Sequence, residues 1–163
     1  MMLVTTTAGL TATAALTHLT CEAAVGLVKG CTRLVSAAAL STAHPSTVDV
    51  KAVLEETDII NRIKVVQAYL LEVKASRWLR DRESIRLATE GVKHAIEQLQ
   101  SSVDAIHGEI ELHATRYFAS WRTPDVERHV AGIRVWSTRL DDRMRTLREV
   151  TTLATLGEPR KDD

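Results

Sequence analysis

The clearest pattern along the chain is a seven-residue repeat of apolar positions between residues 85 and 117. Two rows, offset by four residues, make up this repeat: Ile85, Val92, Leu99, Ile106 and His113, and Thr89, Ile96, Val103, Ile110 and Tyr117. Positions three, four and seven residues apart lie on one face of an α-helix. The pattern therefore predicts a long amphipathic helix with coiled-coil-like heptads, ending near residue 122.

A second repeat of the same kind fills the C-terminal part of the chain. Its two rows are Val126, Ile133, Leu140, Leu147 and Ala154, and Val130, Ser137, Met144 and Thr151. Thr123-Pro124-Asp125 precedes the repeat and Gly157 follows it. Because proline favours the first helical turn and glycine favours the residue after a helix, we expect a helix over 125–156.

The segment from residue 47 to about residue 76 is predicted to be one helix. Its apolar positions follow steps of three and four: Ile59, Ile63, Val66, Leu70 and Val73. Continuing these steps leads to Arg77, Arg80 and Ser84, whereas the next apolar row begins at Ile85. The apolar face thus shifts by about one residue, or roughly 100°. This change of phase predicts a turn over 77–83.

Residues 1–43 form a block rich in alanine and threonine, whose only charged residues are Glu22, Lys29 and Arg33. A helix over 10–40 is expected from a row of small and apolar positions: Leu16, Leu19, Ala23, Leu27, Cys31, Leu34 and Ala38. Such a weakly charged helix is expected to pack against its own bundle or against a partner. Breakers and capping residues over 41–46 end the block, with Ser46 or Thr47 expected to cap the next helix.

These elements together predict an all-α protein. The simplest architecture is an up-and-down bundle of about four long amphipathic helices, since short connections favour antiparallel neighbours. The domain division is a helical segment over 1–43, an antiparallel bundle over 47–156 and a flexible tail over 157–163. An alternative is a three-helix bundle from residue 47 onward, with the first segment detached.

Charge and cysteine content narrow the functional classes. Lysine plus arginine and aspartate plus glutamate both number 21, so no global field favours nucleic acid, and no nucleic-acid partner is expected. Cys21 and Cys31 lie about 15 Å apart along one predicted helix, which excludes a disulfide between them. This usage fits an intracellular protein.

Motifs that would indicate an enzyme are missing from the sequence. It has no Glu-x-x-His pair of the di-iron bundles, no glycine-rich phosphate loop and no Cys-x-x-Cys. His113 occupies a core-row position, where a hydrogen-bonded histidine is commoner than a metal ligand or a general base. We therefore expect a non-enzymatic protein without a cofactor or a metal site.

Aromatic and basic residues gather in two places that are candidate partner-binding sites. The first comprises Arg116, Tyr117, Phe118, Trp121 and Arg122, and the second comprises Trp78 and Arg80. Tryptophan, tyrosine and arginine commonly anchor protein interfaces, although an aromatic plug at a bundle end would use the same residues. Gly26 and Gly30 form a small-xxx-small pair that would let another helix approach closely.

The predicted function is a non-enzymatic structural or protein-interaction subunit of a larger assembly. Its expected partners are protein subunits, further copies of this chain among them. One alternative is a membrane-associated protein anchored through residues 1–40, because the uncharged run over 1–21 is long enough to span a bilayer. Another is a small-molecule binder or an enzyme that uses the bundle interior, which would need polar side chains converging from several helices.

Overall fold

The computed structural model describes residues 5–40, 45–80, 82–115 and 126–157. All its elements are helices: α1 (Thr5–Leu40), α2 (Pro45–Glu56), α3 (Ile59–Ala75), α4 (Arg77–Arg80), α5 (Glu83–Thr115) and α6 (Glu127–Leu156). No strand occurs in these ranges. The predicted all-helical fold is therefore confirmed for the described part of the chain.

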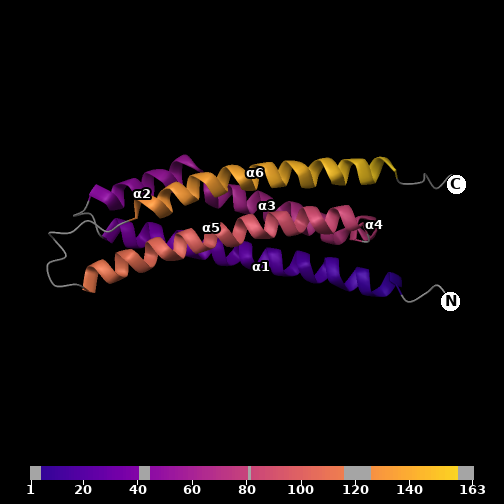
Figure 1. Ribbon diagram of the computed structural model, residues 1–163, viewed down its shortest axis with the longest axis horizontal. Helices are drawn as coiled ribbons and strands as arrows, with labels where there is room; N and C mark the ends of the chain where they lie inside the picture. Colours follow the sequence, from indigo (N-terminus) through magenta and orange to yellow (C-terminus); the bar gives the residue numbers. More distant parts are fainter. Residues whose placement is uncertain (1–4, 41–44, 81, 116–125, 158–163) are drawn as a thin grey trace.

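The helices lie side by side in one elongated, bundle-like body (Figure 1). α1 and α5 run in one direction, whereas α2, α3 and α6 run in the other, so that the start of α1 and the end of α6 lie at the same end. α5 packs along both α6 and α1, and α1 also packs along α2 and α3. The N-terminal helix therefore packs along α2, α3 and α5 of its own chain and also contacts α4.

The helices that pack against one another differ from those expected in a simple up-and-down bundle, where helices consecutive in the chain are neighbours. α3 and α5 follow one another through α4, yet α3 packs mainly on α1, and the parallel helices α1 and α5 are close neighbours. The short helix α4 contacts α1, α3, α5 and α6 and so carries the chain across one end of the molecule (Figure 1). The short connection through α4 therefore does not make α3 and α5 close neighbours.

The single helix expected over residues 47–76 is broken at Asp58, which is a correction to the sequence-based prediction. Asp58 adopts the left-handed region, with φ 46° and ψ 36°. Its carbonyl accepts the amide N–H of Arg62 at 3.1 Å, and its side-chain Oδ1 accepts a hydrogen bond from Asn61 Nδ2 at 2.8 Å. Aspartate tolerates this conformation better than most residues, so α2 can end and α3 restart with a changed phase.

Other helix ends agree more closely with the sequence. α3 ends at Ala75 and α5 begins at Glu83, as the shift of apolar phase predicts, although four residues of the expected turn form α4. α2 begins at Pro45, so Ser46 and Thr47 lie inside its first turn rather than at the capping position. Gly157 occupies the C-cap of α6, and its amide donates to the carbonyl of Leu153.

Most positions of the seven-residue rows in α5 and α6 are buried, whereas Thr151 is half-buried and Tyr117 lies outside the described residues. Fully or nearly fully buried side chains include Ile85, Val92, Ile96, Leu99, Val103, Ile106, Ile133, Leu140 and Leu147. Thr89 and Ser137 are buried in the same rows, whereas His113 is half-buried. These rows, together with the apolar face of α3, form the core.

The buried face of α1 differs from the predicted one over its first half. The buried positions are Thr13, Thr17, Thr20, Ala24, Leu27, Cys31 and Leu34, while Leu19 is 50% exposed. Thr17 Oγ1 donates to the carbonyl of Thr13 at 2.8 Å, and Thr20 Oγ1 donates to that of Leu16 at 2.7 Å. With their hydroxyl groups satisfied inside the helix, these threonines offer methyl groups for close packing.

None of the helices in the described ranges has the length and apolar character that a membrane crossing requires. The N-terminal helix in particular carries threonine along its buried face. The division of the chain at residues 43 and 156 stays a prediction.

Candidate protein-interaction surface

Of the two predicted aromatic and basic clusters, only the one with Trp78 and Arg80 lies among the described residues. Arg116, Tyr117, Phe118, Trp121 and Arg122 lie outside the described residues, and Arg80 belongs to α4. The half-buried Trp78 donates through Nε1 to the carbonyl of Ala154 in α6 at 3.0 Å. The guanidinium of Arg82 lies 4.6 Å from the centre of its ring. Trp78 therefore joins α4 to α6 within the chain.

The two glycines of the small-xxx-small pair face different surroundings. A Cβ atom at Gly30 would lie 3.2 Å from both Gln100 Nε2 and Val103 Cγ1 of α5. A Cβ at Gly26 would meet only Gln100 Oε1, at 3.8 Å. Gly30 thus lies closer to the side chains of α5 than Gly26, which is exposed.

Among the described residues, Cys31 carries a deeply buried thiol. Burial raises the pKa of the Cys31 thiol to about 12, with a further contribution from the nearby Asp104. A thiol with such a pKa stays protonated and unreactive at neutral pH. Within the same residues, no group of three or more His, Cys, Asp or Glu side chains is placed to hold a metal ion.

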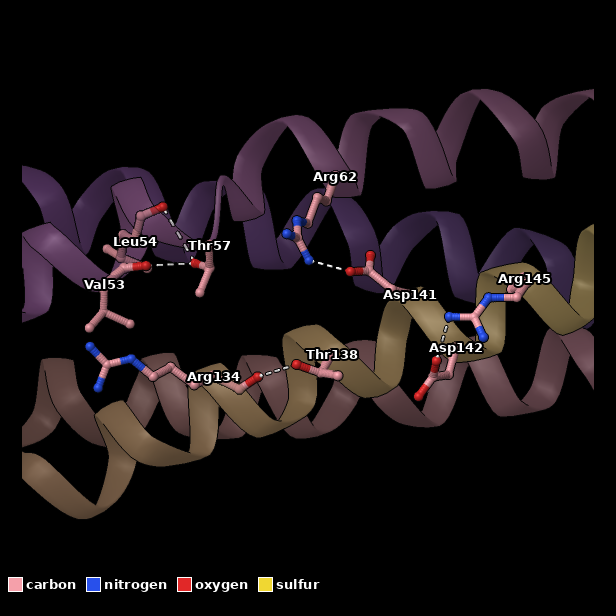
Figure 2. Close-up of polar contacts among 9 residues, drawn as sticks. All are labelled: Val53, Leu54, Thr57, Arg62, Arg134, Thr138, Asp141, Asp142 and Arg145. Carbon is pink, nitrogen blue, oxygen red and sulfur yellow. Dashed lines mark hydrogen bonds and ion pairs between the residues drawn. The ribbon is translucent and has the colours of Figure 1, made fainter.

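Polar side chains connect α6 to the arm formed by α2 and α3. Arg134 pairs with Glu56 at 3.0 Å, Arg62 pairs with Asp141, and the guanidinium of Arg148 lies 5.8 Å from the centre of the Tyr69 ring. Figure 2 shows Arg62 and Asp141 pointing toward each other from α3 and α6. Their three positions on α6 are seven residues apart, so they follow one edge of the helix. Such exposed pairs add little stability, but they set the register of the two helices.

A hollow of about 440 Å³ lies beside these contacts, between α3 and α6. Its walls include the buried side chains of Val66, Leu140 and Met144, with Val65 and Arg145 also lining it. The hollow exists because polar side chains bridge α3 and α6, whereas both helices bury their apolar rows against other helices. We refer to it as the α3–α6 groove.

Next to the groove, one side of α3 is exposed along its whole length. This α3 outer face consists of Asn61, Lys64, Val65, Ala68, Leu71, Glu72 and Ala75. Val65 and Leu71 are 52% and 56% exposed. Among the described residues neither Lys64 nor Glu72 forms an ion pair, whereas Glu56, Arg62 and Lys51 of the same arm do. The face therefore combines exposed apolar groups with two uncompensated opposite charges.

Sequence reasoning passed over the α3 outer face, although a signal was present. Val65 and Leu71 each lie one position from the buried row of Val66 and Leu70, and so point away from it by roughly 100°. Large apolar residues that fall outside the apolar row of a helix have to be either exposed or covered by a further partner. The periodicity could therefore have identified both residues.

A third aromatic and basic group, also missed, lies between α5 and α6. The His94 and Trp136 rings meet edge to face with centres 5.4 Å apart, and the Arg139 guanidinium lies 4.6 Å from the Trp136 ring centre. A hollow of about 300 Å³ adjoins them, lined also by Gly91 and Arg143. Since Trp136 already contacts both His94 and Arg139 of its own chain, this group is better suited to joining the helices than to binding a partner.

Comparison of the chain with protein-family models, with curated proteins and with solved structures gives no match.

Proposed function

We propose that this protein is a non-enzymatic structural or protein-interaction subunit that joins a larger assembly through the α3 outer face and the adjoining groove. The observation that carries the proposal is the exposure of Val65 and Leu71 at 52% and 56% on one side of α3. Between them lies Ala68, which is also exposed. A contiguous apolar strip beside a groove is typical of a surface that another helix covers.

The rest of the molecule fits the role of a rigid support for this surface. In the proposal, α1, α5, α6 and the α2–α3 arm form a four-helix bundle whose seven-residue rows pack in the manner of a coiled coil. The buried rows of α5 and α6 support this, because Val92, Leu99 and Ile106 are fully buried at spacings of seven. Two free cysteines favour a reducing, intracellular compartment for the protein.

The proposal is tested by recovering the full chain from its native source and identifying the proteins retained with it. Leu71→Arg places a charge in the middle of the proposed interface, and Val135→Arg makes the same change at a 50% exposed site on α6. We expect Leu71→Arg to release the retained protein and Val135→Arg to keep it. Equal retention by both variants, or an unaltered chain that binds neither another protein nor a second copy of itself, would contradict the proposal.

Liposome flotation separates this function from the membrane alternative. A chain that acts through the α3 outer face stays with the soluble fraction whether or not Leu71 is replaced. If the unaltered chain floats with anionic liposomes and removal of residues 1–43 ends the flotation, the membrane role through α1 is the better account.

A further inference from the structure

The α3 outer face has a feature that its role as a contact surface does not require: it is self-complementary about Ala68. Lys64 and Glu72 lie four residues before and after Ala68, and Val65 and Leu71 lie three residues before and after it. With roughly 100° of rotation per residue, the first pair lies about 40° to either side of Ala68 and the second about 60° to either side. Opposite charges and large apolar groups are thus arranged symmetrically around a small central residue.

A two-fold axis that passes between two copies at Ala68, at right angles to the row Lys64–Ala68–Glu72, would place a second α3 antiparallel to the first, with the two helices crossing at roughly 50°. Lys64 of one copy then faces Glu72 of the other, and the same contact repeats on the other side of the axis. On either side of this row, Val65 faces Val65 of the other copy and Leu71 faces Leu71. A parallel arrangement would instead oppose Lys64 to Lys64 and Glu72 to Glu72, which is unfavourable. The charges therefore select the antiparallel pairing.

The shape of the face supports the same pairing. The methyl side chain at Ala68 lets two helix backbones come close at the centre of the contact. Leu71 projects from α3, and Val65 borders the α3–α6 groove of about 440 Å³. Val65 of the second copy lies against Val65 and so covers the edge of this groove, whose walls include the apolar side chains of Leu140 and Met144.

We propose that the partner covering the α3 outer face is a second copy of this chain, bound antiparallel about a two-fold axis at Ala68. This inference rests on the proposed function, since it names the occupant of the same surface. Lys64 and Glu72 obtain from the other copy the ion-pair partners that the described residues of their own chain do not supply.

Sedimentation velocity of the full chain over a series of concentrations tests the dimer. Lys64→Glu and Glu72→Lys each create two repulsive contacts, so each is expected to raise the dimer dissociation constant by at least about tenfold. The double variant restores both contacts with reversed polarity and is expected to return to the original constant. Mixing the two single variants should likewise give a heterodimer. Arg128→Glu, an equal change of charge at an exposed site on α6, should leave the constant unchanged.

Ala68→Arg should abolish the dimer while leaving the thermal unfolding curve of the monomer in place, because Ala68 is exposed in one copy. A chain that is monomeric at every concentration overturns the inference, as does a double variant no tighter than the single ones. If the chain is monomeric but still loses a different retained protein on Leu71→Arg, only the dimer fails and the proposed function stands. If Leu71→Arg changes neither the dimer nor the retained proteins, both fail.

Discussion

The neighbouring helices α1 and α5 run in the same direction, yet they bury different chemistry. α5 buries isoleucine, valine and leucine along two rows, whereas the first half of α1 buries Thr13, Thr17 and Thr20 and leaves Leu19 half exposed. All the buried positions of α1 from 13 to 34 nevertheless follow steps of four and three. The difference teaches that the place of a residue in the repeat of four and three steps, and not its type alone, decides whether its side chain is buried. A threonine whose hydroxyl group bonds to its own helix can therefore occupy a core position.

The largest effect is expected from a charge placed in the buried row of α5. Val103 is fully buried next to Gly30 of α1, so Val103→Asp would leave an unpaired carboxylate between the two helices. We expect a loss of at least about 3 kcal/mol of unfolding free energy, measured by chemical denaturation. Glu97→Ala, which removes only an exposed pair with Lys93, should stay within about 0.5 kcal/mol. Similar losses for both variants would show that the buried face is misassigned.

Two leucines of α1 provide the next comparison, because they differ mainly in burial. Leu27 is fully buried and Leu19 is half exposed. Leu27→Ala should cost about 2–5 kcal/mol through lost packing and a cavity, whereas Leu19→Ala should cost less than about 1 kcal/mol. Thermal unfolding of the two variants measures the difference. Equal costs would mean that the leucine-based row predicted from the sequence is the one that packs.

Buried hydroxyl groups should show effects of opposite sign. Thr20 Oγ1 donates to the carbonyl of Leu16, whereas Ser137 Oγ is buried in α6 without a hydrogen-bond partner among the described residues. Thr20→Ala is expected to destabilise by about 1–2 kcal/mol, because it removes a bonded hydroxyl and a packed methyl group. Ser137→Ala should stabilise by about 1 kcal/mol, since it removes an unsatisfied group and raises helix propensity. Denaturation midpoints with the same sign for both would contradict this explanation.

The smallest effect concerns how closely α1 and α5 approach. Gly26→Ala is expected to stabilise by about 0.5–1 kcal/mol, because alanine favours helix and the new Cβ meets only an ordinary contact at 3.8 Å. Gly30→Ala should gain less or should destabilise, since its Cβ would crowd Val103 Cγ1 at 3.2 Å. Paired melting curves measure the difference, and a larger gain at Gly30 would mean that the helices are farther apart than the structure shows.

Two features of the structure could have been predicted from the spacing of apolar residues but were missed, namely the break between α2 and α3 and the exposed apolar side of α3. The shift of apolar phase between Val73 and Ile85 correctly predicts a helix boundary, and a similar irregularity occurs between Leu54 and Ile59, where the apolar step is five. Asp58, a residue that tolerates positive φ, lies within that step and marks the break between α2 and α3. The exposed pair Val65 and Leu71 was likewise visible as a departure from the buried row.

The α3 outer face and the α3–α6 groove are not among the candidate sites predicted from the sequence. The aromatic and basic residues chosen from composition either lie outside the described residues or, like Trp78, contact their own chain. The α3–α6 groove depends on two helices that are bridged by Arg62 and Asp141, which are 79 positions apart in the chain. No local pattern indicates such a pairing, because it depends on which helices become neighbours.

The sequence alone determined the helical class, the boundary near residues 76–83 and the buried rows of α5 and α6. These are local properties, since periodicity and helix-ending residues act within a few turns of the chain. Tertiary structure alone decided that α5 packs beside the parallel α1 and that α4 crosses the end of the molecule to reach Ala154. It also decided that α1 buries threonines, rather than Leu19, in the core of the bundle. Each of these depends on how closely two helices can approach, and that distance is set jointly by side chains far apart in the sequence.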